Sequence, residues 1–397
     1  MSWPTYTVEV QWGTDLTGLI IIGSSTIGST DVIGGMFVDA GYTDETAYVK
    51  SFSLSKGRSG DTGQMMAGTA TIELWDTAGR FNPGHESSPI YANLKPMQIV
   101  RITASWDGTD YVLFFGFIQR IGVRPRKGEH AAYIEATDLF SWLSLARPTI
   151  SSTSTTTTGA AIGVILDAIE WTNPAFRDLD DGDTIDDFSA DGTTPALTLI
   201  RDLLTTERGQ FFIENDGTAR FDSRNARYEE HTSVDHTTSG TMVDLEVTTD
   251  ASTIFNAVSV TKTGTSAQTA NDEDSQRDFG IRDFEAINST YLQSAAQASS
   301  LADYLIWRKK SPTPPATATY RNRSDTIVMM LSVELNDLVN VNENYGNTTG
   351  HWHVENVQHT VSAASKIHET QLLMTRRDIA PIIIGVSTIG STDAVGY

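Results

Sequence analysis

Residues 68–102 read GTATIELWDTAGRFNPGHESSPIYANLKPMQIVRI, and residues 111–121 read YVLFFGFIQRI. Apolar and polar residues alternate along much of both stretches, and β-branched and aromatic residues are frequent, which is typical of strands that bury one face. Similar strand-like stretches occur at residues 8–12, 48–55, 98–106 and 131–139. Several short strands at this spacing favour a barrel or a sandwich, so we expect residues 1–146 to form an N-terminal β-barrel domain.

A polar, threonine-rich segment follows this region and has too little apolar surface to bury, so we expect it to connect two domains. Beyond it, apolar residues recur at helical spacing and predict helices over about 159–171 and 195–208. Alternating residues on both sides of an Asp-Gly turn predict a hairpin over 210–224. Residues 147–245 are therefore expected to form an α+β domain.

The next region combines strands with one long helix. Thr290 and Gln293 have the spacing of a capping box before an apolar face, which predicts a helix over about 290–309. The stretch 264–278 has almost no large apolar residue and is expected to be a loop. Strands are expected at residues 253–262, 325–335, 337–343, 351–363 and 369–377. We expect residues 246–381 to form a second β domain.

The composition excludes several classes of protein. Its 397 residues include no cysteine, which excludes disulfides, thiolate metal sites and cysteine nucleophiles. The 50 acidic and 28 basic side chains give a formal net charge of −22, which argues against a wrapped nucleic acid, because phosphate binding requires Lys and Arg. No run of 18 apolar residues and no signal-like start occurs, so we expect no membrane-spanning segment.

Motifs for a phosphate-binding loop, a serine nucleophile elbow and a zinc peptidase do not occur in the sequence. The acidic loop at 178–187 is only partly similar to a calcium loop, because its glycine directly follows Asp181. In addition, Ser189 stands where the bidentate acid would lie if the loop began at Asp178. We interpret this segment as a solvated acidic loop.

Four histidines are the nearest approach to a zinc site. His351 and His353 lie two residues apart in a predicted strand, so their side chains project from one face, and His359 and His368 follow. The segment otherwise has the regular alternation of a strand, which favours a structural role. We expect no catalytic residue, no cofactor and no metal ligand in this chain.

Several stretches, taken in order, resemble the tail-tip or baseplate hub proteins (minor tail proteins) of long-tailed bacteriophages. The stretch 68–121 is similar to their opening domain, LIRDLLTTERGQFFIENDGTARFDSR at 199–224 to their next signature, and TIFNAVSVTK at 253–262 to a later strand. The remaining signatures are RDFGIRDFEA (277–286), ADYLIWRKKSP (302–312), DLVNVN (337–342), WHVENVQHTV (352–361) and TQLLMTRR (370–377). Each signature alone is loose, and the specificity lies in their order across most of residues 45–377.

The resemblance implies a mainly β fold with α+β parts, in which two tail-tube-like β-barrel domains accompany smaller α/β domains. It implies a structural virion protein and not an enzyme: a homotrimeric hub at the virion tail tip, assembled in the host bacterial cytoplasm. Such a hub would adapt the sixfold tube to a threefold tip and take part in host attachment and DNA delivery. The implied partners are the distal tail ring or tail-tube protein, the tape-measure protein and other tail-tip or receptor-binding proteins, with DNA only in transit through the lumen.

Three alternatives remain open at this point. A sixfold distal tail ring protein also begins with a barrel, and the number of subunits would separate it from a hub. A tail-associated cell-wall hydrolase would need a carboxylate pair in a cleft and would clear host cell walls. A glycan-binding receptor binder would retain host cells.

A sequence repeat near the two ends of the chain points to assembly. Residues 20–35 read IIIGSSTIGSTDVIGG and residues 382–397, the predicted C-terminal segment, read IIIGVSTIGSTDAVGY. Three chains with two copies each would offer six equivalent sites, the number that a sixfold ring requires. The alternative is that each copy closes its own domain or binds a separate copy of one neighbour. The candidate assembly contacts are Ile20, Ile21, Ile22, Thr26, Ile27, Asp31, Ile382, Ile383, Ile384, Thr388, Ile389 and Asp393.

Overall fold

The computed structural model describes residues 3–13, 41–59, 64–126, 129–229, 233–239, 242–342 and 349–377. One large sheet dominates it, with strand order β16-β20-β23-β22-β3-β4-β7-β6-β5-β1-β2 and with β15 and β21 attached beside β22. Its N-terminal strands are β1 (Thr5–Gln11), β2 (Thr43–Asp44), β3 (Val49–Gly57), β4 (Met66–Trp75), β5 (Ile99–Trp106), β6 (Thr109–Arg126) and β7 (Glu129–Thr137). Its C-terminal strands are β15 (His236–Ser239), β16 (Asp244–Val247), β20 (Pro315–Arg321), β21 (Leu338–Asn342), β22 (Gly350–Ser362) and β23 (Ile367–Arg376).

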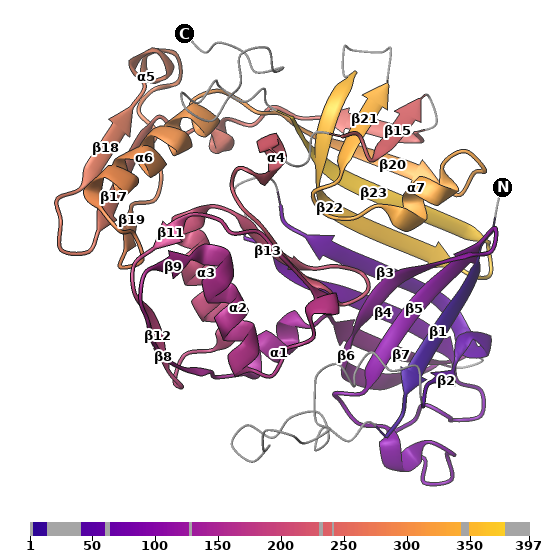
Figure 1. The fold of residues 1–397 in the computed structure, drawn as a ribbon. Coiled ribbons are helices and arrows are strands. Elements are labelled where there is room, and N and C mark those ends of the chain that lie inside the picture. The colour runs from indigo at the N-terminus through magenta and orange to yellow at the C-terminus, as the bar shows by residue number, and fades with distance from the viewer. Residues whose placement is uncertain are drawn as a thin grey trace.

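The N-terminal and C-terminal groups of strands meet inside this sheet. Strands β3 and β22 pair antiparallel from Asn356 opposite Gly57 to Ser362 opposite Ser51, and Figure 1 shows the indigo and yellow strands side by side. The mainly β fold with α+β parts is therefore confirmed, and its two β regions are joined into one continuous sheet. The division of the chain at residues 146, 245 and 381 stays a prediction.

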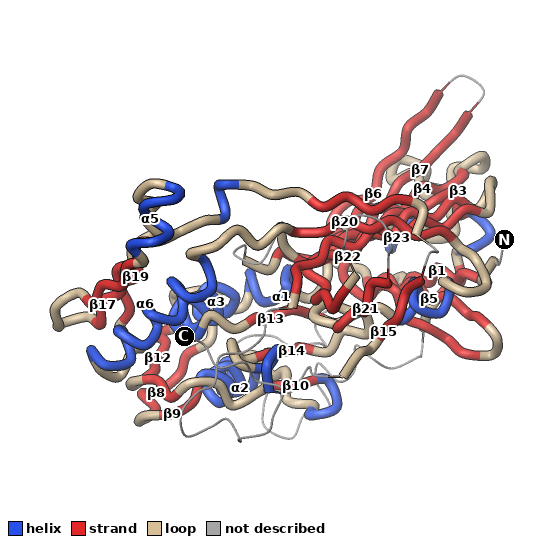
Figure 2. The backbone as a smooth tube through the Cα atoms, turned by 90° about the horizontal axis from the view of Figure 1, so that it is seen from above, coloured by secondary structure: helices blue, strands red, loops and turns tan. Residues whose placement is uncertain are grey.

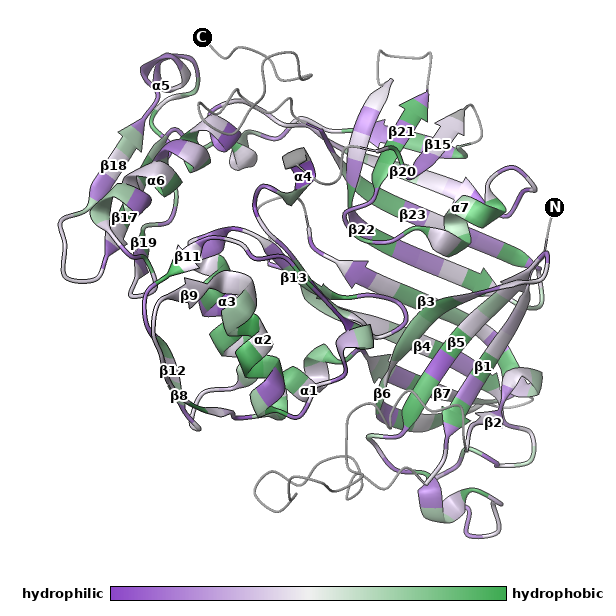
Figure 3. Ribbon diagram, in the orientation of Figure 1, coloured by the Kyte–Doolittle hydropathy of each residue, from purple (hydrophilic) through white to green (hydrophobic). Residues whose placement is uncertain are grey.

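Strand alternation places the core of the sheet. In β1, Tyr6, Val8 and Val10 are buried while the residues between them are partly or fully exposed, and Figure 3 shows apolar and polar bands alternating along the sheet strands. This period of two follows from the pleat, which sends successive side chains to opposite faces. Strands β6 and β7 continue as a hairpin that projects beyond the rest of the sheet in Figure 2.

A compact α/β region packs beside the sheet and carries the predicted helices and hairpin. It contains α1 (Phe140–Leu145), β8 (Thr149–Thr153), β9 (Thr156–Thr157), α2 (Thr158–Ala168), β10 (Arg177–Leu179), β11 (Thr184–Ile185), β12 (Phe188–Asp191), α3 (Ala196–Glu207), β13 (Gln210–Ile213), β14 (Ala219–Asp222) and α4 (Ala226–Glu229). Helix α3 and the β13–β14 hairpin fall on the predicted ranges. Helix α2 ends three residues earlier than predicted, because Glu170 adopts a left-handed conformation (φ 62°) that closes the helix.

A second α/β region is built on the three-stranded sheet β18-β17-β19. Its elements are β17 (Ala257–Lys262), β18 (Gln268–Asn271), α5 (Glu273–Phe279), β19 (Ile287–Ser289) and α6 (Ala295–Lys309). The predicted loop over 264–278 is therefore wrong. Strand β18 gains backbone partners on β17, and Asp272 caps α5 by accepting a hydrogen bond from Ser275 N at 2.9 Å, so neither element needs a large apolar face.

Two further predictions are corrected near the C-terminal half. The long helix begins at Ala295 and not at Thr290, because Ser294 is the cap and accepts a hydrogen bond from Gln297 N at 3.2 Å. The predicted strand over 325–335 is largely the helix α7 (Ile327–Ser332), in which Met330 N donates to Thr326 O at 2.9 Å. A short apolar run fits a buried helix as well as a strand, and here the turn at Thr326 starts a helix.

Candidate functional site

A buried glutamate lies where the large sheet meets the first α/β region. Glu355 sits at a bulge of β22, between Val354 and Asn356, opposite the end of β3. Gly57 allows this close approach: its φ is +111°, and a Cβ atom there would lie 2.2 Å from Glu355 O. Only glycine combines this backbone conformation with this spacing.

The Glu355 carboxylate is held by two arginines and a threonine. Arg58 Nε donates to Oε2 at 2.7 Å, Arg227 Nη1 donates to Oε1 at 2.6 Å, and Thr375 Oγ1 donates to Oε1 at 2.6 Å. Burial favours the neutral acid, but the charges and hydrogen bonds of Arg227 and Arg58 outweigh burial and hold the Glu355 pKa well below its ordinary value. Glu355 is therefore a permanent counterion for both guanidinium groups.

The same network reaches the β13–β14 hairpin. Arg227 Nε donates to Asn336 Oδ1, and Asn336 Nδ2 donates to Asp222 Oδ2 at 2.6 Å. The side-chain oxygen of Gln210, in the orientation that satisfies its neighbours, accepts from Arg58 Nη2 at 2.8 Å and from Arg227 Nη2 at 2.9 Å. Residues from β13, β14, α4 and β22, together with Arg58 directly after β3, are thus joined through buried polar contacts. Such contacts are strong only when every member of the network is satisfied.

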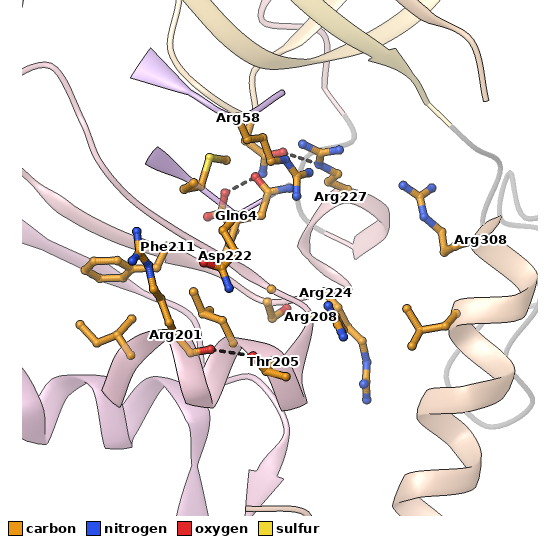
Figure 4. Close-up of a pocket in the computed structure, with 18 of the residues that line it drawn as sticks. Arg58, Gln64, Arg201, Thr205, Arg208, Phe211, Asp222, Arg224, Arg227 and Arg308 are labelled. Atoms are coloured by element: carbon orange, nitrogen blue, oxygen red, sulfur yellow. Dashed lines mark hydrogen bonds between the residues drawn. The ribbon is translucent and has the colours of Figure 1, made fainter. Parts of the chain in front are cut away.

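A cavity of about 120 Å³ opens beside this network, between the hairpin, α3 and α6. Figure 4 shows arginines converging on it from several elements. The basic residues that line it are Arg58, Arg201, Arg208, Arg224, Arg227, Arg308 and Lys309, and Asp222 is the acidic lining residue. Because a guanidinium group stays protonated in proteins, these arginines are suited to binding anions and not to abstracting protons.

The acidic loop 178–187 is tied to the same region. Glu207 is buried and accepts hydrogen bonds from Asp183 N at 2.7 Å and from Thr158 Oγ1 at 3.1 Å. Asp183 pairs with Arg224, and Asp180 Oδ2 accepts from Ser223 N at 2.7 Å. These carboxylate contacts hold the loop against the hairpin. The described residues contain no group of three His, Asp or Glu placed to hold a metal ion.

The four histidines separate into different surroundings. His359 and His368 are buried together, with His359 Nδ1 3.0 Å from His368 Nε2, and the hydroxyl of Tyr6 lies 2.8 Å from His368 Nδ1. His353 is buried elsewhere on β22, with its Nδ1 3.2 Å from Asn336 O, and His351 is exposed. Burial lowers the pKa of His368 to about 3, and burial followed by the charge of His368 and that of Lys56 lowers the pKa of His359 well below its ordinary value.

The predicted assembly contacts cannot be placed in this architecture. Both repeat segments, 20–35 and 382–397, lie outside the described residues. Conversely, sequence reasoning missed the network around Glu355. Its one signal is Glu355, a glutamate that stands between Val354 and Val357 in a predicted strand, where a buried charge needs a partner.

Comparisons with known proteins show which of them share this fold. No family model matches the sequence, and no curated protein matches it. The tail protein from Neisseria meningitidis MC58 is similar over 94% of this chain and 96% of its own, with 10% identity and a TM-score of 0.61. The 43 kDa tail protein of prophage MuSo2 from Shewanella oneidensis is similar over 94% and 98%, with 11% identity and a TM-score of 0.59. A chain of the Francisella PdpA-VgrG complex is similar over 96% of this chain and 59% of its own, with 10% identity and a TM-score of 0.51. The chain thus shares its fold with the Neisseria and Shewanella tail proteins over 94% of its length.

Among the described helices, none is both long and apolar enough to cross a membrane.

Proposed function

We propose that this chain is a structural, non-enzymatic virion protein that forms a trimeric hub at the tip of a phage tail. There it adapts the sixfold tail tube to a threefold tip and takes part in host attachment and DNA delivery. One observation carries the proposal: the fold matches two tail proteins over 94% of this chain and at least 96% of theirs. A match of whole chains is expected for a shared scaffold and not for a single borrowed module.

The internal construction supports a scaffold role. The polar network around Glu355 joins β3, β22, α4 and the β13–β14 hairpin, so its contacts hold distant parts of the chain together. The partners that we propose are two further copies of the chain, the distal ring or tube protein, the tape-measure protein and receptor-binding proteins. The repeat segments 20–35 and 382–397 would meet the sixfold ring at six sites per trimer.

The location of the chain in a particle tests this function. Immunogold labelling of phage particles with antibodies against the purified chain should place gold at the end of the tail distal to the capsid. An antibody against the major tube protein serves as the control and should label along the tail. Gold on the capsid, or along the whole tube, would exclude a hub at the tip.

A further inference from the structure

We propose that the arginine-lined cavity binds a carboxylate side chain from an acidic and apolar segment of a neighbouring protein chain. The charges around the cavity are not balanced. Arg58 and Arg227 share Glu355, and Arg224 pairs with Asp183. By contrast, Arg201 and Arg208 form no ion pair with a carboxylate within the described part of the chain.

These two arginines lie on or directly after α3, and both are about half-buried. The Nε atoms of both are buried without a hydrogen-bond partner among the described residues. Burial lowers the pKa of Arg208, although the charges of Glu285 and Tyr304 oppose this change. A cation held in such surroundings destabilises the empty site, and an anion that enters the cavity relieves that cost.

The backbone conformation of Arg208 supports the proposed carboxylate site independently of the charge argument. Arg208 is the C-cap of α3 and has φ 60°, a left-handed conformation that Gly or Asn adopts at lower cost than arginine. The Arg208 guanidinium lies over the Phe284 ring at 5.2 Å, and the Arg224 guanidinium lies over the Tyr304 ring at 5.6 Å. The aromatic faces therefore hold both cations in place before any ligand arrives.

The size and lining of the cavity decide which anion fits. Its volume of about 120 Å³ is close to that of an engineered cavity of about 150 Å³ that admits one benzene molecule, so it takes one compact group. Its walls include Leu204, Phe211, Phe284 and Tyr304, which suit an apolar neighbour of the acid. A nucleic acid is disfavoured because the chain as a whole carries a formal charge of −22 and would repel a polyanion.

Peptide binding to the full chain tests this site. The probe is a fluorescein-labelled, C-terminally amidated hexapeptide of alternating Leu and Glu, followed by fluorescence anisotropy at low salt. The matched probe replaces every Glu by Gln, and a labelled thymidine hexanucleotide represents nucleic acid. We expect the Glu peptide to bind at least about tenfold more tightly than the Gln peptide or the oligonucleotide, since charge-assisted bonds to arginine are the strong ones.

Two variants test whether the Glu peptide binds in the arginine-lined cavity. Arg208→Gln and Arg201→Gln should each weaken binding of the Glu peptide about tenfold. Arg201→Gln should leave the melting temperature unchanged, because it breaks no ion pair within the described residues. The control Arg277→Gln removes an exposed arginine of α5 and should leave binding unchanged. If one variant fails to fold, the other still reports on the same cavity.

Three outcomes would overturn the proposal: equal binding of the Glu and Gln peptides, tighter binding of the oligonucleotide, or unchanged binding in both Arg201→Gln and Arg208→Gln. The cavity lies within a single chain, so these results are independent of where the chain sits in a tail. A chain that fails to label the tail tip could still bind the acidic peptide, and a tail-tip protein could fail to bind it.

Discussion

Arg227 Nη1 lies 2.6 Å from Glu355 Oε1, although 128 residues separate the two along the chain. This ion pair joins α4 to the bulge of β22, and Arg58, directly after β3, pairs with the same carboxylate. The network therefore links the first α/β region to the continuous sheet.

Replacing Glu355 should strongly destabilise the protein. Glu355→Gln leaves Arg58 and Arg227 buried without their shared counterion, which typically costs about 3–5 kcal/mol. Urea unfolding measures the change. The control Asp274→Asn removes an exposed partner of Arg277 and should cost about 0.5 kcal/mol or less. Similar losses in the two variants would mean that the network contributes little to stability.

The bulge of β22 should depend on the glycine that faces it. Gly57→Ala adds both backbone strain and a clash with Glu355 O, whereas Gly264→Ala adds strain at φ +86° with nothing within 4 Å of the new Cβ. We expect a loss of about 1 kcal/mol for Gly264→Ala and about 1–3 kcal/mol more for Gly57→Ala, measured by urea unfolding. Equal losses of unfolding free energy would show that β22 moves away from the added Cβ atom without a loss of stability.

The cap of α6 should be Ser294. Ser294→Ala removes the acceptor for Gln297 N and should cost about 1 kcal/mol. Thr290→Ala, at the position that the sequence predicted as the cap, changes an exposed residue before the helix and should cost about 0.5 kcal/mol or less. Thermal unfolding of both variants distinguishes the two caps. A larger loss of stability in Thr290→Ala would indicate that the helix begins at Thr290, as the sequence predicted.

Buried histidines should make the protein less stable in mild acid. Burial lowers the pKa of His368 to about 3 in the folded chain from its ordinary value of 6.5, so below pH 6.5 the unfolded chain binds a proton that the folded chain does not. Stability from this group is complete above pH 6.5 and falls as the pH drops toward 3, by about 2 kcal/mol between pH 7 and pH 5. His359, whose pKa is also lowered, adds to the same trend.

Comparison with the variant His368→Asn separates the contribution of His368 to this loss of stability from that of the carboxylates. The free energy of unfolding, measured in urea at pH 7 and pH 5, should fall less in the variant than in the wild type. An identical fall in both proteins would mean that His368 titrates normally in the folded state.

Much of the fold could be predicted because local patterns decide it. The alternation of apolar and polar residues predicted the sheet strands, and the Asp216-Gly217 turn predicted the β13–β14 hairpin. Errors arose where tertiary contacts decide between conformations. The run at 325–335 could be strand or helix, and β18 is a strand because β17 supplies its partners.

The candidate site was largely beyond sequence reasoning. Arg58, Arg227 and Glu355 come together only through the β3–β22 pairing and the position of α4, and spacing along the chain carries no signal for either. The left-handed conformation of Arg208 likewise depends on its tertiary setting. The repeat, by contrast, is visible only in the sequence, and its role in assembly stays a prediction.

Native mass spectrometry of the full-length chain tests the central claim most directly, because a hub and a ring differ in their number of subunits. A trimeric hub predicts an assembly with the mass of three chains. A six-membered ring, or a chain that stays monomeric at high concentration, would contradict the proposed hub.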